Sequence, residues 1–240
     1  MSAFSDAIPR GLIVSCQAGE DSPLHGPAFM AAMARCAALA GATAIRADAP
    51  DDIRAICAAT DLPIIGIFKR RDLEPDAYIT LTIDEVAAIV AAGATAVAID
   101  ATLRPRRYGT EPAALIEQIR RHHPGTLIMA DVTTADEGRR AALAGADAVA
   151  TTLSGYTDYT PSTTGPDLDL VAALASTVRV PVVAEGRYWS AEEVAEALHL
   201  GAHAVVVGTA ITNPIAITRR FVAGVTDALG RGDGRGDRQG

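Results

Sequence analysis

Two charged residues stand directly after apolar runs and could exchange a proton with a substrate. Lys69 follows the run PIIGIF, and Glu185 closes the run PVVA. Partial burial and the neighbouring cations Arg70 and Arg71 would favour the neutral Lys69 amine, which could act as a general base near neutral pH. Glu185 could hold a substrate hydroxyl or serve as the partner acid. A close carboxylate would oppose the lowering of the Lys69 pKa, so this balance stays open, and a salt bridge at the rim is the alternative for the pair.

Other polar side chains also follow apolar runs and could bind a substrate. Gln17 could hydrogen-bond an amide, Arg46 could reach a phosphate or a carbonyl, and Asp131 could accept hydrogen bonds from hydroxyls or orient Lys69. The alternative for each is a structural hydrogen bond to a neighbouring loop, and for Asp100 both interpretations stay open. Burying a polar group costs free energy unless the group is paired. A functional role therefore explains so many polar strand ends better than a purely structural role does.

Two glycine-containing turns favour a phosphate site. Gly186 follows Glu185, and Gly208 and Thr209 follow the last apolar run, where a short helix would begin. Glycine lets backbone N–H groups approach phosphate oxygens closely, and Thr209 can add a hydroxyl donor. The alternative is that these glycines only make tight turns between a strand and a helix.

The elements that must position these residues repeat along the chain. Four Ala-rich helical stretches end in Gly-Ala, with glycine where a helix C-terminus favours a positive φ, at Gly41, Gly93, Gly145 and Gly201. The apolar runs are continuous instead of alternating, as expected of parallel strands buried on both faces. Strands are predicted at Gly11–Ser15, Thr43–Ala47, Pro63–Phe68, Thr95–Asp100, Thr126–Ala130, Asp147–Thr152, Pro181–Ala184 and His203–Gly208. Helices are predicted at Ala28–Ala40, Asp51–Ala59, Ile83–Ala92, Pro112–His122, Ala135–Ala144, Leu168–Thr177, Ala191–Leu200 and Pro214–Leu229.

This order of strands, each followed by a helix, predicts a single (β/α)₈ TIM barrel of the phosphate-binding type, with an open doubly wound sheet as the alternative. Active sites of such barrels form at the carboxyl ends of the strands, where the candidate residues stand. The barrel is predicted to span residues 11–229, after an N-terminal extension at 1–10 and before a tail at 230–240. Met1–Ala7 and the Gly- and Arg-rich tail are expected to be disordered.

Composition argues against several classes of protein. The chain has 21 Lys and Arg against 29 Asp and Glu, so its formal charge is −8. Since no stretch of the sequence clusters its basic residues into a long face, nucleic acid is not an expected partner. The lack of a long apolar run and of a leader predicts a cytoplasmic protein that binds no membrane. Three cysteines without C-x-x-C spacing predict reduced thiols. The histidines lack the spacing of metal ligands, and no Gly-x-Gly-x-x-Gly motif for a dinucleotide follows a predicted strand. No cofactor is therefore expected.

Nine segments, in this order, resemble the N-acetylmannosamine-6-phosphate 2-epimerases of sialic acid catabolism. They are GLIVSCQA (Gly11–Ala18), DSPLHGP (Asp21–Pro27), AIRA (Ala44–Ala47), LPIIGIFKR (Leu62–Arg70), AIDAT (Ala98–Thr102), MADVTT (Met129–Thr134), TTLSGYT (Thr151–Thr157), VVAEGR (Val182–Arg187) and GAHAVVVGTAIT (Gly201–Thr212). Each segment alone is modest, but their order makes the resemblance specific, and it extends to about Phe221.

The resemblance implies an isomerase that interconverts N-acetylmannosamine 6-phosphate and N-acetylglucosamine 6-phosphate, without a metal or nucleotide, by removing and returning the proton at C2. It implies that the catalytic residues are Lys69 and Glu185, that the substrate-binding residues are Gln17, Arg46, Asp131 and Arg187, and that the phosphate-binding residues are Gly186, Gly208 and Thr209. It also suggests a homodimer. One departure concerns Asn213, which stands where the family commonly has Arg. Part of the phosphate contact would then come from elsewhere, for example from Arg187 or Arg219.

The reaction itself asks for two things: a base for the C2 proton and stabilisation of the charge that develops on O1. Whether a second residue returns the proton, or the intermediate turns over Lys69, stays open. Two other hypotheses remain at this stage. One is a Schiff-base aldolase or isomerase in which Lys69 is the nucleophile, and the other is a non-catalytic barrel that binds a sugar phosphate.

Overall fold

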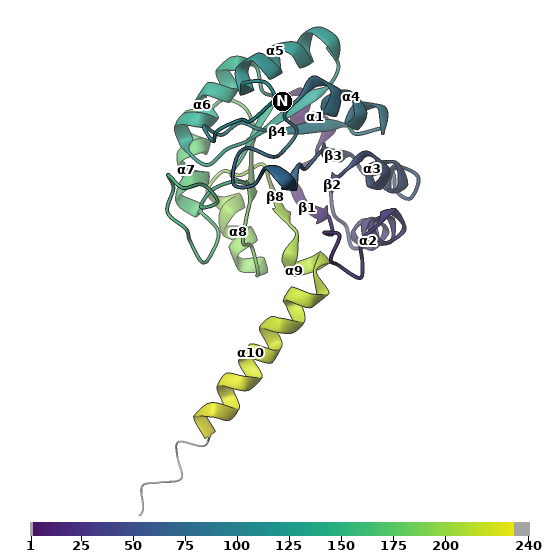
Figure 1. The fold of residues 1–240 in the computed structure, drawn as a ribbon. Coiled ribbons are helices and arrows are strands. Elements are labelled where there is room, and N and C mark those ends of the chain that lie inside the picture. Colours follow the sequence, from purple (N-terminus) through teal and green to yellow (C-terminus); the bar gives the residue numbers. More distant parts are fainter. Residues whose placement is uncertain (1, 233–240) are drawn as a thin grey trace, which may run out of the picture.

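The computed structural model describes residues 2–232 and is a closed barrel of parallel strands (Figure 1). The strands follow one another around the barrel in chain order, and β8 pairs with β1. They are β1 (Gly11–Cys16), β2 (Ala44–Asp48), β3 (Ile64–Ile67), β4 (Ala96–Asp100), β5 (Leu127–Asp131), β6 (Ala148–Ala150), β7 (Val182–Glu185) and β8 (Ala204–Val207). The predicted TIM barrel is therefore confirmed, and the open doubly wound sheet is excluded.

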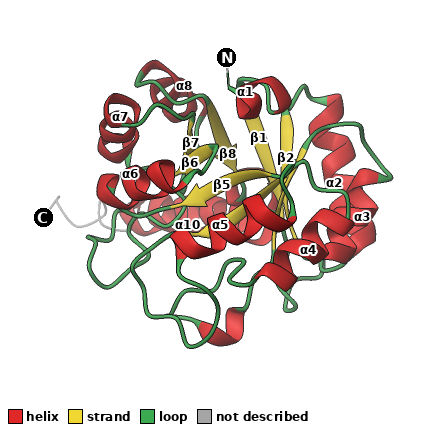
Figure 2. Ribbon diagram, turned by 90° about the horizontal axis from the view of Figure 1, so that it is seen from above, coloured by secondary structure: helices red, strands yellow, loops and turns green. Residues whose placement is uncertain are grey.

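Helices surround the strands when the barrel is seen from above (Figure 2). They are α1 (Ala3–Ala7), α2 (Pro27–Leu39), α3 (Pro50–Cys57), α4 (Ile83–Ala91), α5 (Pro112–His122), α6 (Ala135–Ala144), α7 (Leu168–Thr177), α8 (Ala191–His199), α9 (Thr209–Thr212) and α10 (Pro214–Gly232). A short 3₁₀ helix, η1 (Arg71–Leu73), follows β3. The sequence predicted neither α1 nor η1.

The helix ends show why the alternation is regular. Capping boxes open three helices, in which a hydroxyl accepts from the N3 backbone and a glutamate accepts from the cap backbone: Thr82 with Glu85, Thr134 with Glu137, and Ser190 with Glu193. At the other ends, the four Gly-Ala glycines have φ values of 89° to 106°. These left-handed positions end each helix and turn the chain directly into the next strand.

The barrel interior is filled by apolar side chains that include Ile13, Ile65 and Met129. Phe4 and Ile8, in and just after α1, belong to the same cluster and are fully buried. The expectation that Met1–Ala7 is disordered is therefore wrong for the described part of that segment. Its apolar side chains close the barrel at the end where the strands begin.

The last helix, α10, leaves the barrel and projects away from it (Figure 1). It continues to Gly232, so the predicted start of a disordered tail at Gly230 is wrong, and the rest of that tail lies outside the described residues. Across residues 2–232, no helix combines the length and apolar character needed to cross a membrane.

Candidate active site

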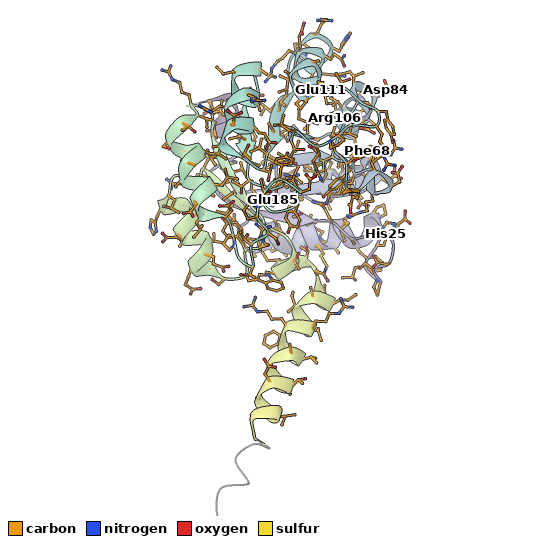
Figure 3. All side chains as sticks on the ribbon, turned by 60° about the vertical axis from the view of Figure 1, so that its left-hand side comes forward. His25, Phe68, Asp84, Arg106, Glu111 and Glu185 are labelled. Atoms are coloured by element: carbon orange, nitrogen blue, oxygen red, sulfur yellow. The ribbon has the colours of Figure 1, made fainter. Side chains whose placement is uncertain are left out.

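A cavity of about 420 Å³ lies over the carboxyl ends of the strands. Eight of the nine residues predicted to form the site line it: Gln17, Arg46, Lys69, Glu185, Gly186, Arg187, Gly208 and Thr209. Figure 3 shows Glu185 in the middle of the barrel, whereas His25 and Asp84 lie at its periphery. The ninth residue, Asp131, is fully buried and does not line the cavity.

Arg46, whose side chain is only 1% exposed, forms the charged floor of the cavity. Its two terminal nitrogens donate to the two carboxylate oxygens of Asp131 at 3.0 and 2.5 Å, which is the bidentate geometry that suits guanidinium and carboxylate. The same Nη1 lies 2.8 Å from Oε2 of Glu185. Two carboxylates therefore share one guanidinium, and this arrangement fixes Arg46 and Glu185 relative to each other.

Lys69 lies on the opposite side of the barrel mouth from β7, just after β3, and is half-buried. Its backbone N–H donates to Oδ1 of Asp48 at 2.9 Å, which anchors the residue at the strand end. Burial lowers the pKa of Lys69, Arg71 and Arg46 lower it further, and Asp48 and Glu185 oppose the shift. Among residues 2–232, no carboxylate forms an ion pair with its ammonium group. The alternative of a rim salt bridge between Lys69 and Glu185 is therefore wrong.

The pKa of Glu185 is shifted upward, opposite to the shift of Lys69. Its burial raises the pKa, Arg46 lowers it, and the neighbouring Asp131 carboxylate raises it again. The Thr152 hydroxyl lies 2.8 Å from Oδ1 of Asp131 and 3.0 Å from Oε2 of Glu185. Since this hydroxyl has a single hydrogen, it donates to one carboxylate at a time. The cavity thus joins an amine that gives up its proton easily with a carboxyl group that holds a proton easily.

The turns after β7 and β8 form the other end of the cavity. Gly186 has a φ of 112°, which favours glycine, and a Cβ at this position would lie 3.9 Å from the Thr152 carbonyl oxygen. Gly208 and Thr209 begin α9, and the Thr212 hydroxyl donates to the Ser15 carbonyl at 2.8 Å, which ties α9 to β1. Exposed backbone at two adjacent glycine turns is the usual setting for a phosphate group in barrels of this type.

The matching family model, described as N-acetylmannosamine-6-phosphate epimerase, covers residues 30–227. A relative from Caldanaerobacter subterraneus subsp. tengcongensis is 49% identical over 215 residues, which cover 90% of this chain and 91% of that protein. A second relative, from Clostridium perfringens strain SM101, is 46% identical over 216 residues, with 90% and 97% covered. Both bear the name N-acetylmannosamine-6-phosphate 2-epimerase as a provisional assignment.

The chain belongs to the N-acetylmannosamine-6-phosphate epimerase family. A solved structure of the N-acetylmannosamine-6-phosphate 2-epimerase from Clostridium perfringens superimposes with a TM-score of 0.86 at 44% identity, over 92% of this chain and 95% of that one. The family resemblance drawn from the sequence is confirmed, and with it an enzyme family of the isomerase class.

Arg187, which was expected to bind the substrate, also makes structural contacts in this member of the epimerase family. It lines the cavity, but its Nε and Nη1 donate to the carbonyls of Gly165 and Ser154, both at 2.8 Å, and it stacks on the Tyr156 ring. Its φ of 61° is unusual for a residue with a side chain. Arg187 thus ties the loop after β6 to the cavity wall.

Sequence reasoning missed several lining residues of this family member: Tyr78, Tyr156, Tyr188 and Trp189. Tyr188 and Trp189 directly follow the motif VVAEGR, which was the available signal, and the buried Tyr188 hydroxyl has no partner among the described residues. Asn213 also lines the cavity, while its Oδ1 accepts from the Ala216 N–H at the start of α10.

Asp100, for which the sequence left two interpretations open, has a structural role. It is fully buried, and its carboxylate pairs with Arg104 at 2.5 Å and accepts from the Thr102 hydroxyl at 2.6 Å. It does not line the cavity.

Proposed function

We propose that this chain interconverts N-acetylmannosamine 6-phosphate and N-acetylglucosamine 6-phosphate by removing and returning the proton at C2. The supporting observation is the position of Lys69, whose amine is half-buried, has a lowered pKa and shares one cavity with Glu185 and the glycine turns. The relatives described above are named as 2-epimerases of N-acetylmannosamine 6-phosphate, which is one sugar of this pair.

In this proposal the substrate reacts in its open form, because C2 is acidic only when C1 is an aldehyde. The neutral Lys69 amine takes the C2 proton, and the electron pair of the broken C–H bond moves toward C1 and O1. Arg46, a fixed cation in the cavity wall, stabilises the negative charge that develops on O1. Return of a proton to the other face of C2 completes the inversion.

Glu185 can contribute in one of two ways to the step that returns a proton to the substrate. Its raised pKa lets it carry a proton, so it can donate to O1 or to the second face of C2. If Lys69 alone carries the proton, part of the substrate hydrogen should return to the product in H₂O–D₂O mixtures. If Glu185 supplies it, the hydrogen should come from solvent.

We revise the proposed role of Asp131 from a sugar ligand to a positioning residue. Both of its oxygens are used by Arg46, and Oδ1 also lies near Thr152. Its charge keeps the guanidinium fixed while Gln17 and Arg46 face the substrate. Gln17 suits the N-acetyl group, because its buried Oε1 has no partner among the described residues and can accept from the substrate amide N–H.

The phosphate group is proposed to bind at Gly186, Gly208 and Thr209. Arg187 and Asn213 line the same cavity, and neither position offers a cation free of protein contacts. We therefore attribute most of the phosphate affinity to backbone N–H groups and the Thr209 hydroxyl.

We further propose a homodimer, supported by α10. Every residue from 218 to 230 is exposed, including Phe221, Val225 and Leu229, so this helix has an apolar face without a partner within the chain. Light scattering is expected to give twice the mass of the chain.

A cytoplasmic location and independence from metals and nucleotides stay predictions. Activity that survives extensive treatment with EDTA is the expected result for the latter.

Proton NMR in D₂O tests the proposed reaction. With N-acetylmannosamine 6-phosphate, the enzyme should produce N-acetylglucosamine 6-phosphate and replace the hydrogen at C2 with deuterium. Binding of the sugar without exchange would support a non-catalytic barrel instead. A stable adduct on Lys69 after borohydride reduction with substrate would support the Schiff-base alternative.

A further inference from the structure

The first turns of α10 present one face to the barrel, although the rest of the helix projects away from it (Figure 1). Ala216 and Ile217 are partly buried on this face, and Asn213, just before the helix, lines the substrate cavity. At about 3.6 residues per turn, position 220 follows position 213 by about two turns and lies on the same face. Arg220 therefore extends from the side of α10 that faces the cavity.

The guanidinium group of Arg220 lies over the indole ring of Trp189, with its Cζ 4.8 Å from the ring centroid. Trp189 lines the substrate cavity and follows Gly186 by three residues. Arg220 is exposed, and this cation–π contact keeps its charge beside the cavity wall. The contact occupies none of the N–H donors in a hydrogen bond, and within residues 2–232 no carboxylate pairs with them. A guanidinium group held in this way can still donate to phosphate oxygens.

The cations that line the cavity are engaged elsewhere. Arg46 pairs with two carboxylates, and Arg187 donates to two backbone carbonyls. Lys69 and Arg71 follow β3, across the barrel mouth from the turn after β7. Arg220 is therefore the cation beside the turns after β7 and β8 that, in the described part of the chain, makes no hydrogen bond to the protein.

We propose that Arg220, held over Trp189, binds the phosphate group of the substrate at the turns after β7 and β8. This inference rests on the phosphate site of the proposed function and names its cation. Backbone N–H groups and the Thr209 hydroxyl hold the phosphate oxygens, and Arg220 adds a positive charge to them. Arg219, which the sequence suggested for this role, lies about 100° around the helix from Arg220 and so lies off the face that meets the cavity.

The test removes the charge of Arg220 and keeps an apolar contact with Trp189. Arg220→Met does both, because a thioether also packs against aromatic rings. Calorimetry measures the Kd for inorganic phosphate, and steady-state rates with N-acetylmannosamine 6-phosphate give kcat and KM. Arg220→Met should raise the Kd and the KM at least about fivefold and change kcat less than about twofold, since the contact is made to the phosphate and not to the reacting carbon. Arg219→Met, which removes the same charge from the next position, should match the wild-type protein in all three quantities.

Two further measurements distinguish phosphate binding from a purely structural contact between Arg220 and Trp189. Trp189 is the only tryptophan of the chain, so its fluorescence reports on this contact alone. Titration of the wild-type protein with inorganic phosphate should change that fluorescence with the Kd that calorimetry gives. The difference in Kd between the wild-type protein and Arg220→Met should also shrink as NaCl is raised from about 0.05 M to about 0.5 M, because salt screens an exposed cation.

Three results would overturn the proposal: an Arg220→Met variant with the wild-type Kd, an equal loss of affinity in Arg219→Met, or Trp189 fluorescence that stays constant while calorimetry shows phosphate binding. If Arg220→Met fails to fold, Arg220→Gln takes its place in the same comparison. Failure of the proposed reaction would show separately, as a wild-type protein that binds phosphate through Arg220 and does not exchange the C2 hydrogen.

Discussion

Replacement of Asp131 by Asn should separate positioning of Arg46 from contact with the substrate. The wild-type carboxylate accepts two hydrogen bonds from a guanidinium that is almost fully buried. An Asn keeps one acceptor and turns an NH₂ group toward a second donor, so one charge-assisted bond and the ion pair are lost. A loss of about 1.5–3 kcal/mol in the free energy of unfolding follows, or roughly 3–12 °C in Tm for a domain of this size.

The same change should lower kcat/KM by about 10²-fold, since a cation displaced by an ångström or so no longer meets the charge on O1. Removal of the Asp131 charge should also lower the pKa of Glu185, because that charge raises it. Thermal unfolding and the NMR exchange assay measure the two effects. Asp136→Asn is the matched control, because Asp136 pairs with Arg139 and Arg140 at the surface and should cost less than about 0.5 kcal/mol. An Asp131→Asn variant as stable and as active as this control would refute the role assigned to the buried pair.

Further predictions concern the base and the closed end of the barrel. Lys69→Ala should lower kcat/KM by at least about 10²-fold in the NMR assay without changing Tm by more than a few degrees. Since the base must be neutral and Arg71 helps to lower its pKa, Arg71→Gln should move the low-pH limb of the kcat/KM profile to higher pH; Arg70→Gln, whose guanidinium lies beside Asp72, should not. Phe4→Ala should cost about 3–5 kcal/mol in urea unfolding, and a cost near zero would show that α1 does not close the barrel.

The parts of the fold that depend on local signals were predictable from the sequence. The Gly-Ala steps mark where each helix must end, and the continuous apolar runs mark strands buried on both faces. Once the barrel is inferred, its geometry brings the strand ends to one mouth, so Lys69 and Glu185 could be placed together although they are far apart in the sequence.

The parts that depend on pairing between distant side chains were not predictable. Asp131 follows its strand as a ligand-binding residue would, but Arg46 of another strand uses both of its oxygens. Likewise, Phe4 has no periodic pattern around it that would indicate burial. The direction of α10 depends on the backbone at Asn213, which propensity alone does not fix.

The proposed role of the Lys69 amine, as carrier of the C2 proton, can be tested by incubating N-acetylmannosamine 6-phosphate in D₂O with wild-type protein and with Lys69→Ala. The quantity to measure is the deuterium content at C2. We expect exchange and epimer formation with the wild-type protein, and neither above background with a folded Lys69→Ala variant that still binds inorganic phosphate. Exchange at the wild-type rate in that variant would show that Lys69 is not the base.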